Sequence, residues 1–304
     1  PWIWDCDNQT KDDILHLFAK SEIDLKLNNF TTSNLELYFE KTNKDTYLKI
    51  FDNQLFNNRS KPKNPDILSS GIDLNLIHKR FTLDSGFSTY EDLNKLQSDR
   101  YQFILPYFNL NSELFSNNLF RVNLSSNGSN ILQNTNNLRT KVINNLNFSS
   151  NQLVSSKTGL KSSFNLFLKN PNTVAKEDDI YKSSPQSELM NIFEFNTSYP
   201  MVKKDTNKTD LLTPKISLRI NPGDMKNHKN TDRTINVNNI FTIDRLGLED
   251  SFESGKSLTV GLDYFSTETE NKNELSAKLA TVFRDQQQNT IPKKTTLSEK
   301  NSYL

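Results

Sequence analysis

The chain contains 304 residues, of which 34% are hydrophobic, 10% are aromatic and 24% are charged, and its formal net charge is +1. Lysines and arginines are scattered rather than clustered, which gives no support to nucleic-acid binding, and the aromatic content argues against a disordered chain. The single cysteine, Cys6, excludes a disulfide framework or a cysteine-based metal site within the chain.

Mean hydropathy is low, at −0.69, and no window approaches the roughly 18 consecutive apolar residues of a transmembrane helix. This value does not exclude a membrane β-barrel, because such a barrel presents apolar residues to lipid only at every second strand position. The sequence begins at Pro1 without an initiator methionine, a signal peptide or a basic leader, so we expect it to be part of a longer protein.

The amino-terminal third shows apolar and polar residues alternating with the period of two that is typical of strands. Strands are expected over 14–27, 34–42, 46–51, 69–80 and 81–90. Asn43-Lys44-Asp45 is short enough to form a hairpin turn between 34–42 and 46–51. Residues 90–98 fit one or two helical turns.

The middle of the chain continues this pattern. Residues 101–115 form its most aromatic stretch, and Pro106 within them predicts a bulge or bend because proline removes a ladder donor. Further strands are expected over 119–125, 138–149, 160–169 and 274–283, with Asn-rich connections such as NGSN at 127–130. A weaker pair spans 187–203 and is interrupted by Pro200.

The clearest alternation lies between Leu211 and Phe265, where two strands at 211–220 and 256–265 flank a linker. Because successive side chains of a strand point to opposite faces, each strand has an apolar and a polar face. The apolar faces carry Ile216, Leu218, Ile220, Leu258, Val260, Leu262 and Tyr264. The polar faces carry Lys215, Arg219, Thr259 and Asp263.

Catalytic and metal-binding patterns are missing from the sequence. His16, His78 and His228 lie far apart and have no neighbours at ligand spacing, so we expect structural or surface roles for them. There is no nucleophile elbow, phosphate loop or dinucleotide-binding pattern, and adjacent carboxylates such as Asp178-Asp179 lie in predicted loops. We therefore expect no catalysis, no metal and no cofactor.

Several segments share a longer pattern. They are TYLKIFD at 46–52, PYFNL at 106–110, TNNLRT at 135–140, LTPKISLRINPGD at 212–224, NIFTIDRLGLEDSFESGKSLTVGLDYF at 239–265 and VFRD at 282–285. These segments resemble the barrel region of the LPS-assembly protein family LptD, also called organic solvent tolerance protein. The family pattern N-L-F-x-x-N-R-[FL]-x-G-x-D-x-x-E-x-G is matched by Asn239, Phe241, Arg245, Asp250, Glu253 and Gly255, whereas Asp244 stands where the family often has Asn.

The resemblance implies an all-β fold, an antiparallel transmembrane β-barrel that is partial, with both ends of the barrel missing. Residues 1–304 would be a fragment of this single outer-membrane domain, with poorly defined ends at 1–13 and 286–304. LptD-like proteins lie in the cell outer membrane of Gram-negative bacteria and insert lipopolysaccharide into its outer leaflet. The implied partners are lipopolysaccharide, the membrane, an LptE-type lipoprotein plug and an LptA-type periplasmic bridge.

In such a barrel the apolar faces defined above would contact lipid, and the polar faces would line the lumen. Two hypotheses remain for the 236–256 loop. Asp250 and Glu253 could contact the plug or a divalent ion that bridges lipid phosphates, or Arg245 could pair with one of them and pin the loop inside the lumen. Two other classes of protein also remain open: a general porin or receptor barrel, and a soluble Asn-rich β-sandwich adhesin or binding module.

Overall fold

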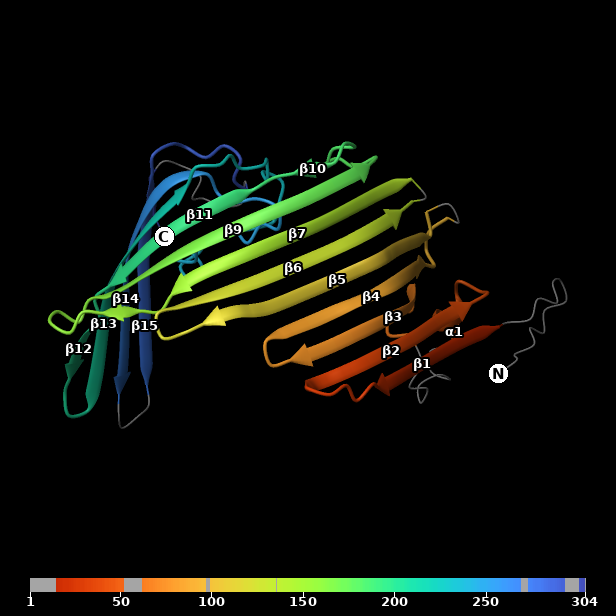
Figure 1. The fold of residues 1–304 in the computed structure, drawn as a ribbon, viewed down its shortest axis with the longest axis horizontal. Helices are drawn as coiled ribbons and strands as arrows, with labels where there is room; N and C mark the ends of the chain where they lie inside the picture. The colour runs from red at the N-terminus through yellow and green to blue at the C-terminus, as the bar shows by residue number, and fades with distance from the viewer. Residues whose placement is uncertain are drawn as a thin grey trace. The chain divides into compact units, whose positions relative to one another are not determined.

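A computed structural model of the chain describes residues 15–51, 62–96, 99–134, 136–268 and 273–292, together with the backbone of 301–303 (Figure 1). Cys6 and the rest of the amino-terminal segment lie outside these residues. The described residues group into two compact units. The described residues of unit 1 lie within 1–112, 125–144 and 171–187, and those of unit 2 lie within 113–124, 145–170 and 188–304.

The fold is all-β and its strands pair antiparallel, which confirms the predicted fold class at this level. Unit 1 contains β1 (His16–Asp24), β2 (Phe30–Thr42), α1 (Tyr47–Ile50), β3 (Ile67–His78), β4 (Phe81–Asp92) and β10 (Gln186–Ser187). Unit 2 contains β8 (Leu153–Val154), β11 (Met190–Ser198), β12 (Met201–Lys204), β13 (Lys208–Asn221), β14 (Gly255–Glu268), β15 (Glu274–Arg284) and β16 (Asn301–Tyr303). Both units include parts of β5 (Tyr101–Ser116), β6 (Phe120–Gln133), β7 (Asn137–Ser150) and β9 (Lys161–Lys176).

The strands follow one another in the sheet in almost the order of the sequence. The order is β1-β2-β3-β4-β5-β6-β7-β9-β11-β13-β14-β15-β16, while β8 and β10 pair with β9 and β12 pairs with β13. Within the described residues β1 pairs with β2 alone and β16 with β15 alone, so the sheet is open. Such a meander of neighbouring hairpins is what short polar turns between alternating strands predict.

The bulge predicted at Pro106 is confirmed. Gly86 of β4 faces Tyr107 of β5, whereas Ser88 faces Ile104, so Leu105 and Pro106 together oppose one residue of β4. The interrupted pair at 187–203 is likewise present as β11 and β12.

The strand predicted over 46–51 is wrong, because these residues form α1 instead. Tyr47 and Leu48 are both buried, and they form an apolar cluster with Leu68 and Leu93 against which Phe51 packs. A strand would send the neighbours Tyr47 and Leu48 to opposite faces, whereas in a helical turn they point only about 100° apart, so one cluster can bury both. The hairpin predicted at Asn43-Lys44-Asp45 is lost for the same reason.

Two further predictions are wrong in the described residues. The helical turn expected over 90–98 is replaced by the end of β4 and a turn, in which the Asn94 amide donates to Asp92 Oδ1 over 3.1 Å. The NGSN segment lies inside β6 rather than in a connection. There Asn130 Nδ2 donates to the Leu105 carbonyl over 3.0 Å and the Phe108 ring occupies the space above Gly128, so cross-strand partners satisfy a sequence that favours turns.

Candidate functional site

The two faces of β13 and β14 differ in how they are covered. Leu218 faces Leu258 on the apolar face, and these side chains are 40% and 39% exposed. On the polar face, Arg219 and Thr259 are only 4% and 2% exposed. The sequence pattern therefore places the residues as predicted on opposite faces, but it is the polar face that is buried. Which face meets lipid or a lumen stays a prediction.

The apolar face of unit 2 continues across neighbouring strands in register. Phe195 of β11 faces Phe164 of β9 on one side and Leu218 of β13 on the other. On the next strand Leu258 faces Phe283 of β15. These cross-strand pairs form a continuous apolar band, and a large exposed band of this kind marks contact with a partner or a membrane.

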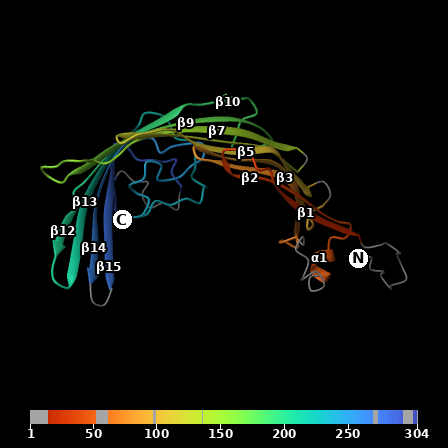
Figure 2. The same cartoon turned by 60° about the horizontal axis from the view of Figure 1, so that its bottom comes forward.

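The polar face of unit 2 is covered by the connection between β13 and β14, residues 222–254, which we call the covering loop (Figure 2). Ile240, Leu246 and Leu248 of the loop pack with Ala280 and Val282 of β15. A second cluster joins the loop to β9 and β11; its members are Phe252, Met190, Ile192, Phe167 and Ile243. The loop thus packs its apolar residues against apolar side chains of β9, β11 and β15 that lie among the polar residues of this face.

Glu253 of the covering loop accepts hydrogen bonds from three buried arginines. Arg245, also in the loop, donates from Nε to Oε2 and from Nη2 to Oε1, both over 2.6 Å. Arg219 of β13 donates from Nη1 to Oε2 over 3.0 Å, and Arg284 of β15 donates from Nε to Oε1 over 2.8 Å. This arrangement, the Glu253 cluster, fastens the loop to two strands that are separated by β14.

Electrostatics in the Glu253 cluster favour the charged carboxylate. Burial works to raise the pKa of Glu253, but the positive charges of Arg245, Arg219 and Arg284 outweigh it and hold the pKa well below its usual value. Charge-assisted and bidentate bonds of this type are the stronger ones in proteins. The carboxylate is saturated by arginine, which supports a role in fastening the loop rather than in binding a divalent cation.

Asp250 occupies a different position from Glu253, although both belong to the predicted motif. Its carboxylate is buried, lies 3.2 Å from His228 Nε2 and 3.7 Å from Lys226 Nζ, and thus ties two points of the covering loop together. His228 therefore has a structural contact, as expected. The other two histidines contact aromatic rings: His16 stacks on Tyr47, and His78 lies against Phe30 and Phe81.

The remaining motif residues shape the loop and its return to the sheet. Asn239 Oδ1 accepts from the Asn236 amide over 2.8 Å, which closes a turn. The Phe241 ring lies over Gly261 of β14, where an added Cβ would come within 2.6 Å of it. Gly255 has φ +80°, a conformation that favours glycine, at the first residue of β14. Each motif residue therefore has a local structural reason.

Three residues of this site were not selected from the sequence: Lys169, Glu194 and Arg284. Lys169 of β9 is buried, contacts the Leu248 carbonyl and lies 3.2 Å from Asp244 Oδ2. Glu194 of β11 accepts from Asn165, Asn196 and Ser217. Arg284 lies in the VFRD segment that contributed to the resemblance, so only this residue had a signal in the sequence.

The polar face of unit 1 carries acidic residues in register. Glu22 of β1 faces Glu36 of β2, which faces Asp73 of β3. Lys20 Nζ lies 3.2 Å from Glu22 and 2.8 Å from Glu36, and the Tyr107 hydroxyl donates to Asp73. These groups neutralise part of the charge, and the carboxylates remain partly exposed.

No group of three His, Cys, Asp or Glu side chains is placed to hold a metal ion within the described residues. In the same part of the chain, no helix is long and apolar enough to cross a membrane. A scan against protein-family models and a search among curated proteins find no match to this chain.

Proposed function

We propose that this chain is part of an outer-membrane β-barrel that inserts lipopolysaccharide into the outer leaflet of the Gram-negative outer membrane. The observation that carries the proposal is the distribution of the two faces in unit 2, where a continuous apolar band is exposed while the polar face is covered. A soluble β-sandwich has the opposite arrangement, because its apolar faces form the core between two sheets.

A bilayer makes this distribution favourable. Transfer of apolar surface from water contributes about 25 cal/mol per Å², so leaving the Phe195, Leu218 and Leu258 row in water would be costly. Between its two edges the sheet also satisfies the donors and acceptors of the strand backbones, which is a condition for crossing lipid. In the proposed orientation the apolar face meets lipid, and Lys215, Arg219, Thr259 and Asp263 face the lumen.

The assignment to lipopolysaccharide rests on the resemblance to LptD-like proteins. Most of its motif lies in the covering loop, where Arg245 and Glu253 pair, and the last motif residue, Gly255, starts β14. We propose that the loop is held on the lumen side and that the barrel works with an LptE-type plug and an LptA-type bridge. A general porin or receptor barrel shares the two faces but gives no reason for this motif.

The first test is to fractionate cells that express the complete parent gene and to compare heated and unheated outer membranes on a denaturing gel. A heat-shifted band followed by loss of surface lipopolysaccharide on depletion is expected. A soluble, unshifted band would overturn the membrane assignment in favour of a soluble adhesin. A shifted band with normal lipopolysaccharide export would support the barrel assignment and reject the transport role.

The orientation is tested by cysteine scanning with a membrane-impermeant thiol reagent in intact cells. Cysteine at Thr259 is expected to react only after the covering loop is loosened by Arg245→Ala, because Thr259 is buried beneath the loop. Cysteine at Leu258 is expected to stay unlabelled in lipid and to react after detergent extraction. Strong labelling of Leu258→Cys in intact membranes would contradict the orientation.

The role of the loop is tested by Arg245→Ala alone. A lower level of assembled barrel is expected, because this change removes the bidentate partner of Glu253. Normal assembly with a selective loss of lipopolysaccharide transport would instead favour a direct binding role for Asp250 and Glu253.

A further inference from the structure

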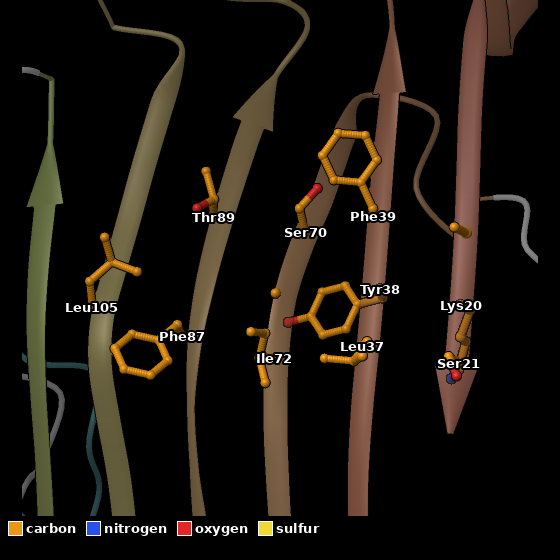
Figure 3. A pocket seen from close by; sticks show the side chains of 12 residues that line it. Lys20, Ser21, Leu37, Tyr38, Phe39, Ser70, Ile72, Phe87, Thr89 and Leu105 are labelled. Carbon is orange, nitrogen blue, oxygen red and sulfur yellow. The ribbon is translucent and has the colours of Figure 1, made fainter. Parts of the chain in front are cut away.

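The apolar face of unit 1 contains a groove of about 470 Å³ that crosses β1 to β5 (Figure 3). Large side chains rise beside it in cross-strand register: Leu37 of β2 faces Ile72 of β3, which faces Phe87 of β4. The smaller side chains of Ala19 and Thr89 line the groove next to these large ones. The alternation of large and small side chains therefore produces a furrow across the strands.

The lining offers an occupant no charge. Lys20 is the one charged residue in the lining, but it alternates with Ala19 and Ser21, so its ammonium lies on the polar face with Glu22 and Glu36. The Tyr38 hydroxyl has a partner in Ser88 Oγ at 3.1 Å. The rest of the lining is predominantly apolar, and Phe87 and Phe39 are 50% and 45% exposed. An apolar and uncharged occupant fits these conditions.

The dimensions of the groove favour a single narrow hydrocarbon chain as the occupant. It spans five strands, and at about 4.8 Å per interstrand spacing its length is roughly 19 Å. One leaflet of a bilayer core is about 15 Å thick, which is the length that one lipid acyl chain covers. The volume falls within the roughly 300–1,000 Å³ of small-molecule sites.

We propose that this groove holds one acyl chain of a membrane phospholipid, bound to unit 1 as a structural lipid. The inference rests on the proposed membrane location, because only there does the apolar face meet lipid. Strands of membrane barrels tilt by about 35–45°, so a groove across them holds the chain obliquely and separates it from the surrounding leaflet.

The test places one fluorophore in the groove. Phe87→Trp is made in a chain whose Trp2 and Trp4 are replaced by phenylalanine, and Phe195→Trp in the same background is the matched probe on the apolar band of unit 2. Phosphatidylcholine with a brominated acyl chain is titrated into each protein in detergent micelles. Saturable quenching at one lipid per chain is expected for the Phe87→Trp protein, and a linear response for the Phe195→Trp protein.

Ala19→Leu, added to the Phe87→Trp protein, fills the groove and is expected to abolish the saturable quenching. Ala277→Leu, the same change on exposed β15, should leave it intact. Saturable quenching that survives Ala19→Leu, or linear quenching at both probes, would overturn the inference. Flotation of each variant with phosphatidylcholine vesicles separates the two proposals: a chain that floats but shows no saturable quenching rejects only the groove, whereas a chain that does not float rejects the membrane location.

Discussion

The strands of both units alternate apolar and polar residues, but the polar faces of the two units differ in their exposure to solvent. In unit 1 the acidic row of Glu22, Glu36 and Asp73 is partly exposed and is balanced mainly by Lys20. In unit 2 the polar face is buried under the covering loop, and Glu253 joins three arginines there. Alternation therefore determines the strands, whereas the connection between two strands determines whether polar groups meet water or one another.

This difference has an energetic consequence. Charges at an exposed face remain solvated, so their pairs contribute little to stability. Buried charges must be fully paired, and removal of one partner leaves the others without compensation. The same kind of substitution should thus have a small effect in unit 1 and a large one in unit 2.

The largest difference in the free energy of unfolding is expected between the Glu253→Gln and Glu22→Gln variants. The Glu253 side chain is 1% exposed and that of Glu22 is 68% exposed. Loss of the Glu253 charge leaves three buried guanidiniums, which we expect to lower the free energy of unfolding by about 3–5 kcal/mol. Glu22→Gln should change it by less than about 0.5 kcal/mol. Urea unfolding of both variants in detergent measures the difference, and equal effects would contradict a fastening role for the Glu253 cluster.

A smaller loss of stability is expected from replacing a glycine that makes room for an aromatic ring. Gly261→Ala would push against Phe241 of the covering loop, whose ring lies 2.6 Å from the added Cβ. We expect a loss of about 1–3 kcal/mol from overpacking, together with faster proteolysis of residues 222–254. Adding Phe241→Ala should restore the space.

Gly128→Ala in unit 1 is the matched control, because its Cβ would meet the Phe108 ring of a neighbouring strand. It should destabilise the sheet without exposing the covering loop to protease. Equal proteolysis of the loop in both variants would show that the contact between Phe241 and Gly261 does not hold it.

The pH dependence of stability should also report on the charge of the Glu253 cluster in unit 2. The pKa of Glu253 is lowered on folding from a starting value of 4.5. Its contribution is therefore complete above about pH 4.5, and it is lost as the pH falls toward the folded pKa, by up to about 1.4 kcal/mol per pH unit. Urea unfolding between pH 7 and 3 should show the difference between wild type and Glu253→Gln shrinking below pH 4.5, and a constant difference would contradict this assignment.

Much of this fold follows from local sequence. The period of two located the strands that became β13 and β14, and proline located the bulge in β5, because both effects act between adjacent residues. The strand prediction for residues 46–51 is wrong because α1 is stabilised by contacts with Leu68 and Leu93, which lie outside the local pattern. Tertiary burial outweighed strand propensity there.

The candidate site was predictable only in part. Arg245 and Glu253 are eight residues apart and belong to one motif, so the sequence itself offers their pairing as a hypothesis. Lys169 reaches the Leu248 carbonyl across 79 positions of sequence, and no pattern near Lys169 indicates that contact. Alternation assigned Arg219 to the polar face, but its burial depends on a loop that the strand itself does not encode.

The smallest expected effect concerns Lys215 and Asp263, which pair on the polar face of unit 2 where the cover is incomplete. Their side chains are 33% and 28% exposed, so solvent screens the pair. A double-mutant cycle with Lys215→Met and Asp263→Asn should give a coupling energy of about 0.2–1 kcal/mol. The same cycle with Arg245→Met and Glu253→Gln should give several times more, because that pair is fully buried. Comparable coupling energies would mean that the covering loop does not exclude water from the Glu253 cluster.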